Sequence, residues 1–409
     1  MHLGRKYLIL LLFTGAFFQS KAQEANVDAV SWQLYQSCNW KSLSSFCDSA
    51  IGKGFDYYYL RLRAGIACYE LQQYRRAIPH FQKARTFNHA DQVAGPYLYY
   101  CYLASSEYEE ASWLRKSLTA DSALAAGMNL KKQPALAFIH AEGALKVTSA
   151  ANYQTADYAS LGLQHFICKK YSLYHSFSFY GQKEFRYTIR QYEYYLRPVI
   201  PFRHGFSLTL GLHALYDYTI RTQQAPPDDT LHTGAPPDQE NTPEKSIGFA
   251  GGFTLTKHGT FFDYSAGATG SYIDSTFQNL VDVSILYFPF RNNRLSFGGH
   301  AYLHTQDAFK TSYVGFSPVL DAKICKRVSV AASWFWNVGE NISENTAYLI
   351  NNSEDLTTSR GTAGVYVKVT KAFTLYGIYS YENKLETKHS STYHYDIFLA
   401  GIRYVPGGN

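Results

Sequence analysis

Hydrophobic and polar positions follow two different periods along this chain, and the change falls near residue 130. Residues 24–130 place their apolar side chains at helical spacing, and two prolines, Pro79 and Pro96, fall within that stretch. From about residue 135 onward, apolar and polar residues alternate, and Tyr, Phe, Gly, Ser and Thr become frequent. The first pattern predicts α-helices, and the second predicts β-strands with one apolar face.

The helical part repeats with a period of 34 residues, which is the distance from Trp40 to Tyr74 and from Tyr74 to Tyr108. The central copy has small and aromatic residues at positions that resemble the tetratricopeptide repeat, where small side chains let two paired helices approach. We expect a tetratricopeptide-type helical solenoid of three repeats. The residues expected to pack within it are Trp40, Gly65, Tyr69, Tyr74, Ala77, Phe81, Ala84, Tyr108 and Ala111.

The outer copies of the repeat depart from the central one. Where the central copy has Phe81, the outer copies have Cys47 and Arg115. Terminal repeats are often atypical, because one of their faces meets solvent or another domain. An unrelated helical bundle is the alternative. A solenoid this short performs no chemistry itself, so we expect it to offer a concave surface to a partner protein.

The second half alternates over segments of roughly 10–14 residues, and a β-sandwich or a β-barrel would both show alternation. Soluble strands usually run about 5–6 residues, whereas a tilted strand that crosses a bilayer needs about 9–11. The long segments therefore predict an antiparallel transmembrane β-barrel of about 14 strands, with 12 as the alternative because the first is weak. The predicted strands are 135–146, 155–167, 171–181, 186–198, 205–219, 247–256, 261–273, 277–290, 294–305, 311–324, 328–339, 359–369, 373–384 and 392–404.

The connections between these strands alternate between short and long. Residues 291–293 and 325–327 are short basic turns, whereas 220–246 and 340–358 are long and rich in Pro, Asp, Glu and Asn. Bacterial barrels have short periplasmic turns and long external loops. We therefore expect both long segments to face the cell exterior, and an even number of strands returns both barrel ends to the periplasm.

The first 22 residues have the form of a secretory signal peptide. Arg5 and Lys6 precede an apolar run over 7–18, and Ser20-Lys21-Ala22 offers a cleavage site. An apolar run of about a dozen residues is shorter than the ~20 that a spanning helix needs, so we expect the segment to be cleaved. An uncleaved signal anchor is the alternative. The predicted organisation is a signal peptide (1–22), a periplasmic tetratricopeptide-repeat domain (23–130) and an outer-membrane β-barrel (131–409).

Composition favours a barrel over a helical membrane protein. Aromatic residues make up 17% of the chain although its mean hydropathy is −0.26, which is typical of alternating strands with aromatic girdles. The 38 Lys and Arg residues nearly balance the 32 Asp and Glu residues, and no basic stripe indicates a nucleic-acid partner. The six cysteines show no metal-binding spacing, so no metal or other cofactor is expected and their pairing stays open.

Three barrel segments resemble those of YaiO-like outer-membrane proteins of the Bacteroidota type: 157–165 (DYASLGLQH), 173–177 (LYHSF) and 191–195 (QYEYY). Members of that family are similar in layout as well, with a signal peptide and tetratricopeptide repeats before the barrel. The same order of parts resembles exporters of cellulose and poly-N-acetylglucosamine, which have a longer solenoid. The resemblance implies transport or secretion across the outer membrane, with a polysaccharide as one candidate cargo.

Eight charged residues and two histidines fall within the predicted strands. A basic residue that faces lipid at the bilayer midplane costs roughly 2–4 kcal/mol, so we expect these side chains to face the barrel lumen and pair there. They could line a conduit or plug the interior, and the sequence leaves both open. The candidates are Arg190, Glu193, Asp217, Asp263, Asp282, His300, His304, Asp321, Lys323 and Lys368.

Histidines could instead serve an outer-membrane lipase, but the alternation places His300 and His304 away from the lipid, and no serine has a nucleophile-elbow motif. Our leading hypothesis is a non-enzymatic protein that assists transport across the outer membrane. It would contact outer-membrane lipid through its barrel and bind a periplasmic or envelope protein through its repeats. The second hypothesis is a sealed barrel that anchors the repeat domain as a scaffold, and the third is a barrel enzyme.

Overall fold

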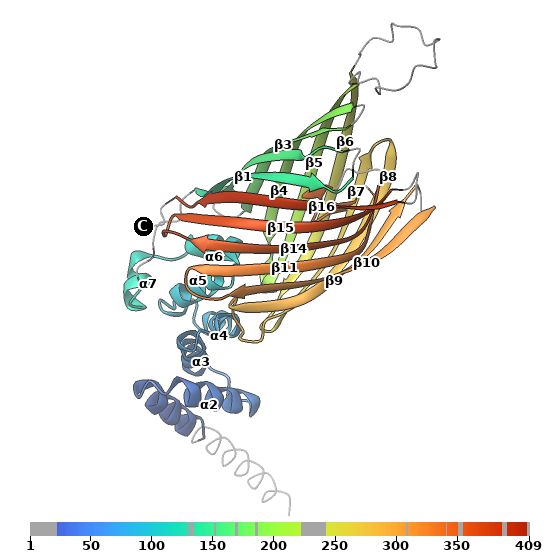
Figure 1. Cartoon of the computed structure of the whole chain (residues 1–409). Helices are drawn as coiled ribbons and strands as arrows, with labels where there is room; N and C mark the ends of the chain where they lie inside the picture. Colours follow the sequence, from blue (N-terminus) through green and yellow to red (C-terminus); the bar gives the residue numbers. More distant parts are fainter. Residues whose placement is uncertain are drawn as a thin grey trace, which may run out of the picture. The chain divides into compact units, whose positions relative to one another are not determined.

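The computed structural model describes residues 23–406 with gaps at 129, 131–134, 151–152, 168–170, 185–186, 222–242, 308–309, 341, 351–354 and 387–390. The predicted signal peptide (1–22) and most of the long connection 220–246 lie outside the described residues. The chain divides into a helical unit, which runs up to Lys132 and also includes Phe290–Asn292, and a β-barrel unit of Gln133–Pro289 and Asn293–Asn409. Figure 1 labels the elements of both units. Among the described helices, none combines the length and the apolarity that crossing a bilayer requires.

The helical unit is a series of helices in which each packs against the next from α2 to α6, and α7 packs against α5. Every second helix begins at one of the three aromatic residues of the 34-residue period, because Trp40, Tyr74 and Tyr108 are the first residues of α2, α4 and α6. Residues 23–36 are helical, followed by α2 (Trp40–Gly52), α3 (Tyr58–Glu70), α4 (Tyr74–Phe87), α5 (Ala94–Ala104), α6 (Tyr108–Arg115) and α7 (Ala120–Ala125).

The central helix pair touches through small residues. Ala77, Phe81 and Ala84 of α4 have no exposed surface. A Cβ atom added to Gly65 on α3 would lie 2.6 Å from the Phe81 ring, so only glycine allows the ring to rest against the α3 backbone. Ala111, at the matching position of α6, is also fully buried.

The aromatic residues at the repeat positions pack less completely. Trp40, Tyr69 and Tyr74 are partly buried against the core of the helical unit. Tyr108, which was expected to pack in the same way, is 46% exposed. Its copy is followed by α7, a helix of only 6 residues that packs against α5.

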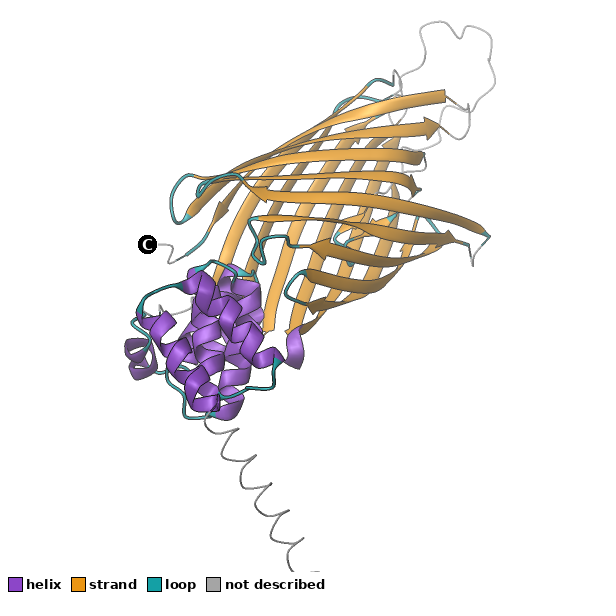
Figure 2. Ribbon diagram, turned by 90° about the horizontal axis from the view of Figure 1, so that it is seen from below, coloured by secondary structure: helices purple, strands orange, loops and turns teal. Residues whose placement is uncertain are grey.

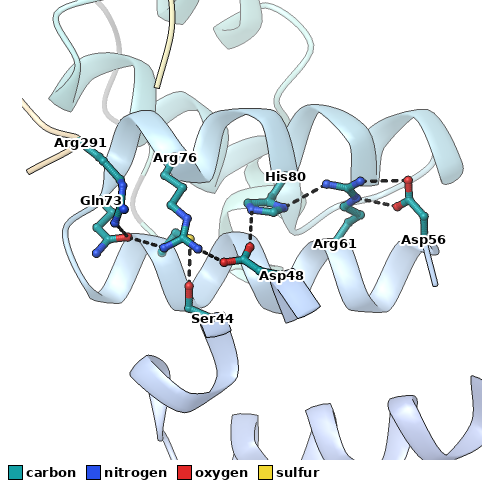
Figure 3. A network of polar contacts seen from close by, with 9 residues as sticks. Ser44, Asp48, Asp56, Arg61, Gln73, Arg76, His80 and Arg291 are labelled. Carbon is teal, nitrogen blue, oxygen red and sulfur yellow. Dashed lines mark hydrogen bonds and ion pairs between the residues drawn. The ribbon is translucent and has the colours of Figure 1, made fainter. Parts of the chain in front are cut away.

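A polar network follows α2, α3 and α4 (Figure 3). Nη1 of Arg61 lies 3.3 Å from Nδ1 of His80, and Nε2 of His80 points toward Asp48 at 4.0 Å. Because an arginine can only donate, Nδ1 of His80 carries no proton and the ring is the neutral Nε2–H tautomer. Burial, helped by Arg61 and Arg76, lowers the pKa of His80 to about 4. The helical unit therefore holds an uncharged histidine among charged neighbours.

The second unit is a closed antiparallel barrel of fourteen strands (Figure 2), in which β1 pairs with β16 to complete the ring. The prediction of fourteen strands is confirmed, and each predicted segment matches one of them. The strands are β1 (Leu136–Thr148), β2 (Ala156–Ile167), β3 (Tyr171–Lys183), β4 (Tyr187–Pro201), β5 (Phe206–Arg221), β6 (Glu244–His258), β7 (Phe262–Ile273), β8 (Thr276–Tyr287), β9 (Leu295–Gln306), β10 (Thr311–Lys323), β11 (Val328–Gly339), β14 (Leu356–Lys368), β15 (Phe373–Glu386) and β16 (Ser391–Tyr404). Between β4 and β5 lies a short 3-10 turn, η1 (Arg203–Gly205).

The two faces of each strand meet different surroundings. On β8, Val281 and Val283 point outward and are 48% and 51% exposed, whereas Gln278 and Leu280 on the other face are 2% and 3% exposed. Large apolar side chains are exposed in the same way on the other strands of the ring. A continuous apolar outer wall of this kind is typical of a barrel whose surroundings are lipid.

Candidate functional site

The segment between β11 and β14 folds into the barrel lumen. The prediction that 340–358 projects outward as an external loop is wrong for residues 342–350, which form a hairpin from β12 (Ser343–Glu344) and β13 (Leu349–Ile350). Ile342 is 1% exposed and packs with the inward-facing Tyr302 and Phe335. The polar composition of this segment indicates polar surroundings. The lumen of a barrel is polar as well, so composition does not distinguish it from the cell exterior.

The tip of the hairpin rests on strands β4 and β5. The Tyr195 hydroxyl donates to the Thr346 carbonyl at 3.1 Å, and Nδ1 of His213 lies 2.7 Å from the Ala347 carbonyl, to which it donates. A Cβ atom on Gly211 would lie 1.8 Å from the Thr346 carbonyl oxygen. Glycine at 211 is therefore required for the tip to reach the wall.

The turn at the tip is strained and is held by the wall. Asn345, Thr346 and Ala347 have φ of 51°, 58° and 64°. A β-branched residue such as Thr346 rarely adopts this left-handed conformation, and each such residue costs roughly 1–3 kcal/mol. The hydrogen bonds from the wall to the tip offset this cost, including one of 2.8 Å between the Thr254 and Thr346 hydroxyls.

The hairpin is also fastened by buried ion pairs. Arg360 on β14 donates two hydrogen bonds of 2.7 Å to the Glu344 carboxylate. Arg360 lies 3.9 Å from Glu382 on β15, which pairs with Lys146 on β1 at 3.2 Å. Two acids and two bases thus alternate across the lumen. Burying charges is tolerable only when they are paired in this way, so the chain of pairs ties the hairpin to three strands.

Two cavities remain beside the hairpin. The larger has a volume of about 540 Å³ and is bounded by β1–β5, β14–β16 and hairpin residues 348–350. The smaller, of about 360 Å³, is lined by the turn and by Asp282 and His300 of the wall. Arg197 and Tyr348 line both cavities. The tip region therefore separates the lumen into two chambers.

Tyrosine, histidine and carboxylate groups line the larger cavity. Nε2 of His140 lies 2.7 Å from the Tyr174 hydroxyl, and the Tyr376 hydroxyl donates to Glu142 at 2.8 Å. A Cβ atom on Gly162 would lie 2.2 Å from Nε2 of His140, so this glycine makes room for the network. Hydroxyl groups can donate and accept, and the wall can therefore satisfy several kinds of polar solute.

Nine of the ten predicted lumen residues occupy inward-facing positions. Glu193 lines the larger cavity, and Asp282 and His300 line the smaller one, where their side chains lie 3.8 Å apart. Asp263 lies 3.1 Å from His258. The inward positions also include Asp217 and His304, which are buried, and Asp321, Lys323 and Lys368, which are exposed near strand ends.

Arg190 is a correction, because it lies on the outward face. Its side chain is exposed. The next residue, Gln191, points to the opposite face of β4, where it and Glu193 line the larger cavity. Arg190 is the fourth residue of β4, which begins at Tyr187. At this depth a long guanidinium side chain can reach the aqueous boundary, so the cost of facing lipid falls away.

Sequence reasoning missed most of the groups that fasten the hairpin. Lys146, Arg360 and Glu382 share an inward face with cavity-lining neighbours, so the alternation of their strands could have identified them. Glu344 could not have been identified in this way, because it lies in a segment with no regular alternation of apolar and polar residues. Within the described ranges, no three His, Cys, Asp or Glu side chains are grouped so as to hold a metal ion.

No protein-family model matches the chain, and no curated protein matches it in sequence. Among solved structures, the CymD monoaromatic hydrocarbon channel is similar at 7% identity over 67% of this chain and 89% of the other, with a TM-score of 0.45. A Pseudomonas aeruginosa FadL homologue is similar at 10% identity over 66% and 90%, with a TM-score of 0.42. Acinetobacter baumannii Omp33 is similar at 10% identity over 67% and 100%, with a TM-score of 0.37. Identities and scores this low assign neither a family nor a substrate to this chain.

Proposed function

We propose that this chain is a non-enzymatic outer-membrane transport protein whose barrel lumen is narrowed by the hairpin 342–350. The observation that carries the proposal is the cavity of about 540 Å³ that the hairpin leaves open, which is lined by both polar and apolar side chains. A barrel that served only as an anchor would have no need of uncovered charged side chains inside. With the hairpin in place, the lumen suits a small solute. A polysaccharide, the candidate cargo suggested by the order of parts, would require the hairpin to move.

The outer membrane is the proposed location, and the apolar outer wall supports it. Phe249, Val283 and Phe316 are each 50–57% exposed on outward positions of different strands. Leaving so much apolar surface in water would be costly. The helical unit would then lie in the periplasm, as the even number of strands suggests.

We further propose that the helical unit is a tetratricopeptide-repeat domain that binds an envelope protein, and that the chain is YaiO-like. The close contact between Gly65 and Phe81 and the 34-residue spacing of helix starts support this assignment. A deletion of residues 23–130 tests whether the barrel conducts by itself and the helical unit serves only to bind the partner. It should leave the conductance of the purified barrel unchanged and abolish transport in cells.

Single-channel recording in planar bilayers tests the transport proposal. The natural chain should give small, flickering conductance steps, because the hairpin narrows the lumen. Replacing residues 342–350 by a short Gly-Ser linker should increase the conductance several-fold. A barrel that conducts nothing in both forms would contradict the proposal.

A sealed scaffold is the second candidate, and the tight seating of the hairpin favours it. Ile342 and Ala347 are 1% and 0% exposed, as expected of a permanent plug. The same recordings separate the two candidates. A scaffold would be silent as the natural chain and conduct only after hairpin removal, whereas a transport protein would conduct in both forms.

A further inference from the structure

The larger cavity has an apolar wall, although the interior of a transmembrane barrel is usually polar. Ile378 of β15 and Ile397 and Leu399 of β16 line it, together with Leu349 and Ile350 of the hairpin. Leu349 is 39% exposed even though it lies inside the barrel. Apolar side chains left uncovered in a cavity favour an apolar ligand group over water.

The opposite wall carries two carboxylates at one level. The strand registers align Glu142 with Ser160, Ser160 with Ser178, and Ser178 with Glu193. The Ser178 hydroxyl lies 3.3 Å from the Glu193 carboxylate, which confirms that the row faces inward. Glu142 and Glu193 both line the cavity. The row therefore presents two carboxyl groups, three strands apart, with two serine hydroxyl groups between them.

Neither carboxylate has a basic partner stronger than histidine. In the described part of the barrel, no lysine or arginine nitrogen lies within 4.0 Å of Glu142 or Glu193, whereas Glu344 and Glu382 are paired with Arg360 and Lys146. Their polar contacts are Tyr376 at 2.8 Å, Tyr158 at 3.4 Å and His140 at 3.7 Å for Glu142, and His213 at 3.2 Å, Ser178 at 3.3 Å and Gln191 for Glu193. Glu193 faces Nε2 of His213, whose Nδ1 already donates to the Ala347 carbonyl, whereas Glu142 has only two tyrosine hydroxyls and His140 as partners. A carboxylate removed from water without full charge compensation favours a bound cation, and this applies most to Glu142.

We propose that this cavity binds an amphiphilic organic cation. The ammonium group would lie between Glu142 and Glu193 among the cavity tyrosines, which attract cations through their ring faces. The hydrocarbon or aromatic body would lie against Ile397, Leu399 and Leu349. A volume of about 540 Å³ is within the usual range for a small-molecule site. As a transported cargo this ligand rests on the proposed function, but its binding can be measured without transport.

An anionic ligand fits the cavity less well. Three arginines line the cavity: Arg197 lies 5.0 Å from the Tyr174 centroid, Arg403 lies 4.9 Å from that of Phe138, and Arg360 is paired with Glu344. Along β4, Arg197 is four residues from Glu193, which is about 13 Å in an extended strand. If the anionic group of a compact ligand lay at Arg197, the rest of the ligand would lie against the row of Glu142 and Glu193.

Calorimetric titration of the full chain in lipid nanodiscs tests this proposal with three matched probes: 4-phenylbutylamine, the neutral 4-phenylbutanol and the anionic 4-phenylbutyrate. The amine should bind about tenfold more tightly than the alcohol, as expected for a charge-assisted contact. In the Glu142→Gln, Glu193→Gln double variant, the amine should bind no more tightly than the alcohol. If that variant lacks the heat-resistant gel migration of a folded barrel, the Glu193→Gln single variant should show a reduced preference.

Asp321→Asn is the matched control, because it removes an inward-facing carboxylate that does not line the cavity. It should keep the tenfold preference for the amine. Equal binding of the amine and the alcohol, tighter binding of the butyrate, or an equal loss in Asp321→Asn would overturn the proposal. Conductance without amine preference would contradict this inference alone, and amine preference without conductance would contradict only the transport proposal.

Discussion

The helical unit and the barrel place their polar and apolar groups on opposite sides. In the helical unit, Ala77 and Phe81 are fully buried in an apolar core. In the barrel, apolar residues such as Val283 are on the outside, and the interior holds ion pairs such as Arg360 with Glu344. One rule explains both arrangements: the side chains on each surface match the polarity of the medium that the surface faces. The lesson is that a charge is harmful or useful according to the side on which it lies, and four changes test this.

A charge in the apolar core of the helical unit should have the largest effect. Ala77→Arg places a long cation where the alanine has no exposed surface, so we expect a loss above roughly 4 kcal/mol and an unfolded helical unit. The barrel should keep its heat-resistant gel migration. Far-UV circular dichroism and the gel shift measure the two units separately, and failure of both together would contradict independent units.

Removing a charge from the barrel interior comes next. Arg360→Ala leaves the Glu344 carboxylate, 4% exposed, without the guanidinium nitrogen that donates to both of its oxygens, and losing one member of a buried pair costs roughly 3–5 kcal/mol. We expect the hairpin to leave its place, with faster proteolysis near Glu344 and a larger conductance.

A double variant provides the control for that change. Arg360→Met with Glu344→Leu removes both charges and keeps much of the volume, so the hairpin should stay protected. If Arg360→Ala alone leaves the hairpin protected, the ion pair does not hold it.

A charge on the apolar outer wall should cost somewhat less. Val283 is 51% exposed on the outward face of β8, near the middle of the strand, so Val283→Lys should destabilise the barrel by roughly 2–4 kcal/mol in lipid. The neighbouring Ser284 faces inward, where its hydroxyl lies 2.5 Å from that of Ser265. Ser284→Lys should cost much less. Urea unfolding in vesicles measures both, and equal losses would contradict the assignment of the two faces.

Protonation of His80 introduces a charge without any mutation and should have the smallest effect. Its folded pKa of about 4 lies below the ordinary value of 6.5, so the unfolded chain takes up the proton first as the pH falls. The contribution of the neutral ring is complete above pH 6.5 and is lost as the pH falls toward 4. Between pH 7.5 and 5 we expect a loss of about 2 kcal/mol.

The comparison variant for this pH effect is His80→Gln, which cannot titrate in that range. Thermal unfolding of the isolated helical unit, if it folds alone, or of the unit within the full chain should then show a flatter dependence between pH 7.5 and 5. An unchanged pH dependence would show that another group is responsible.

The sequence by itself determined the fourteen strands and their faces. Alternation has a period of two, so one set of side chains must face lipid and the other the lumen, and this placed Glu193, Asp282 and His300 correctly. The 34-residue period identified Trp40, Tyr74 and Tyr108 as equivalent positions, and each of them begins a helix. Arg190 was misplaced because the rule that charges face inward weakens near strand ends.

Only the tertiary structure decided what fills the barrel. The hairpin 342–350 has no period, and its polar composition suits an external loop and a polar lumen equally. Its position depends on contacts between residues far apart in the chain, such as Tyr195 with Thr346, and on the space that Gly211 leaves. The same holds for the cavity, because its apolar wall joins Ile397 and Leu349 from separate segments. Such contacts arise from the closure of the ring, which brings the first and last strands together, and no local pattern in the sequence encodes it.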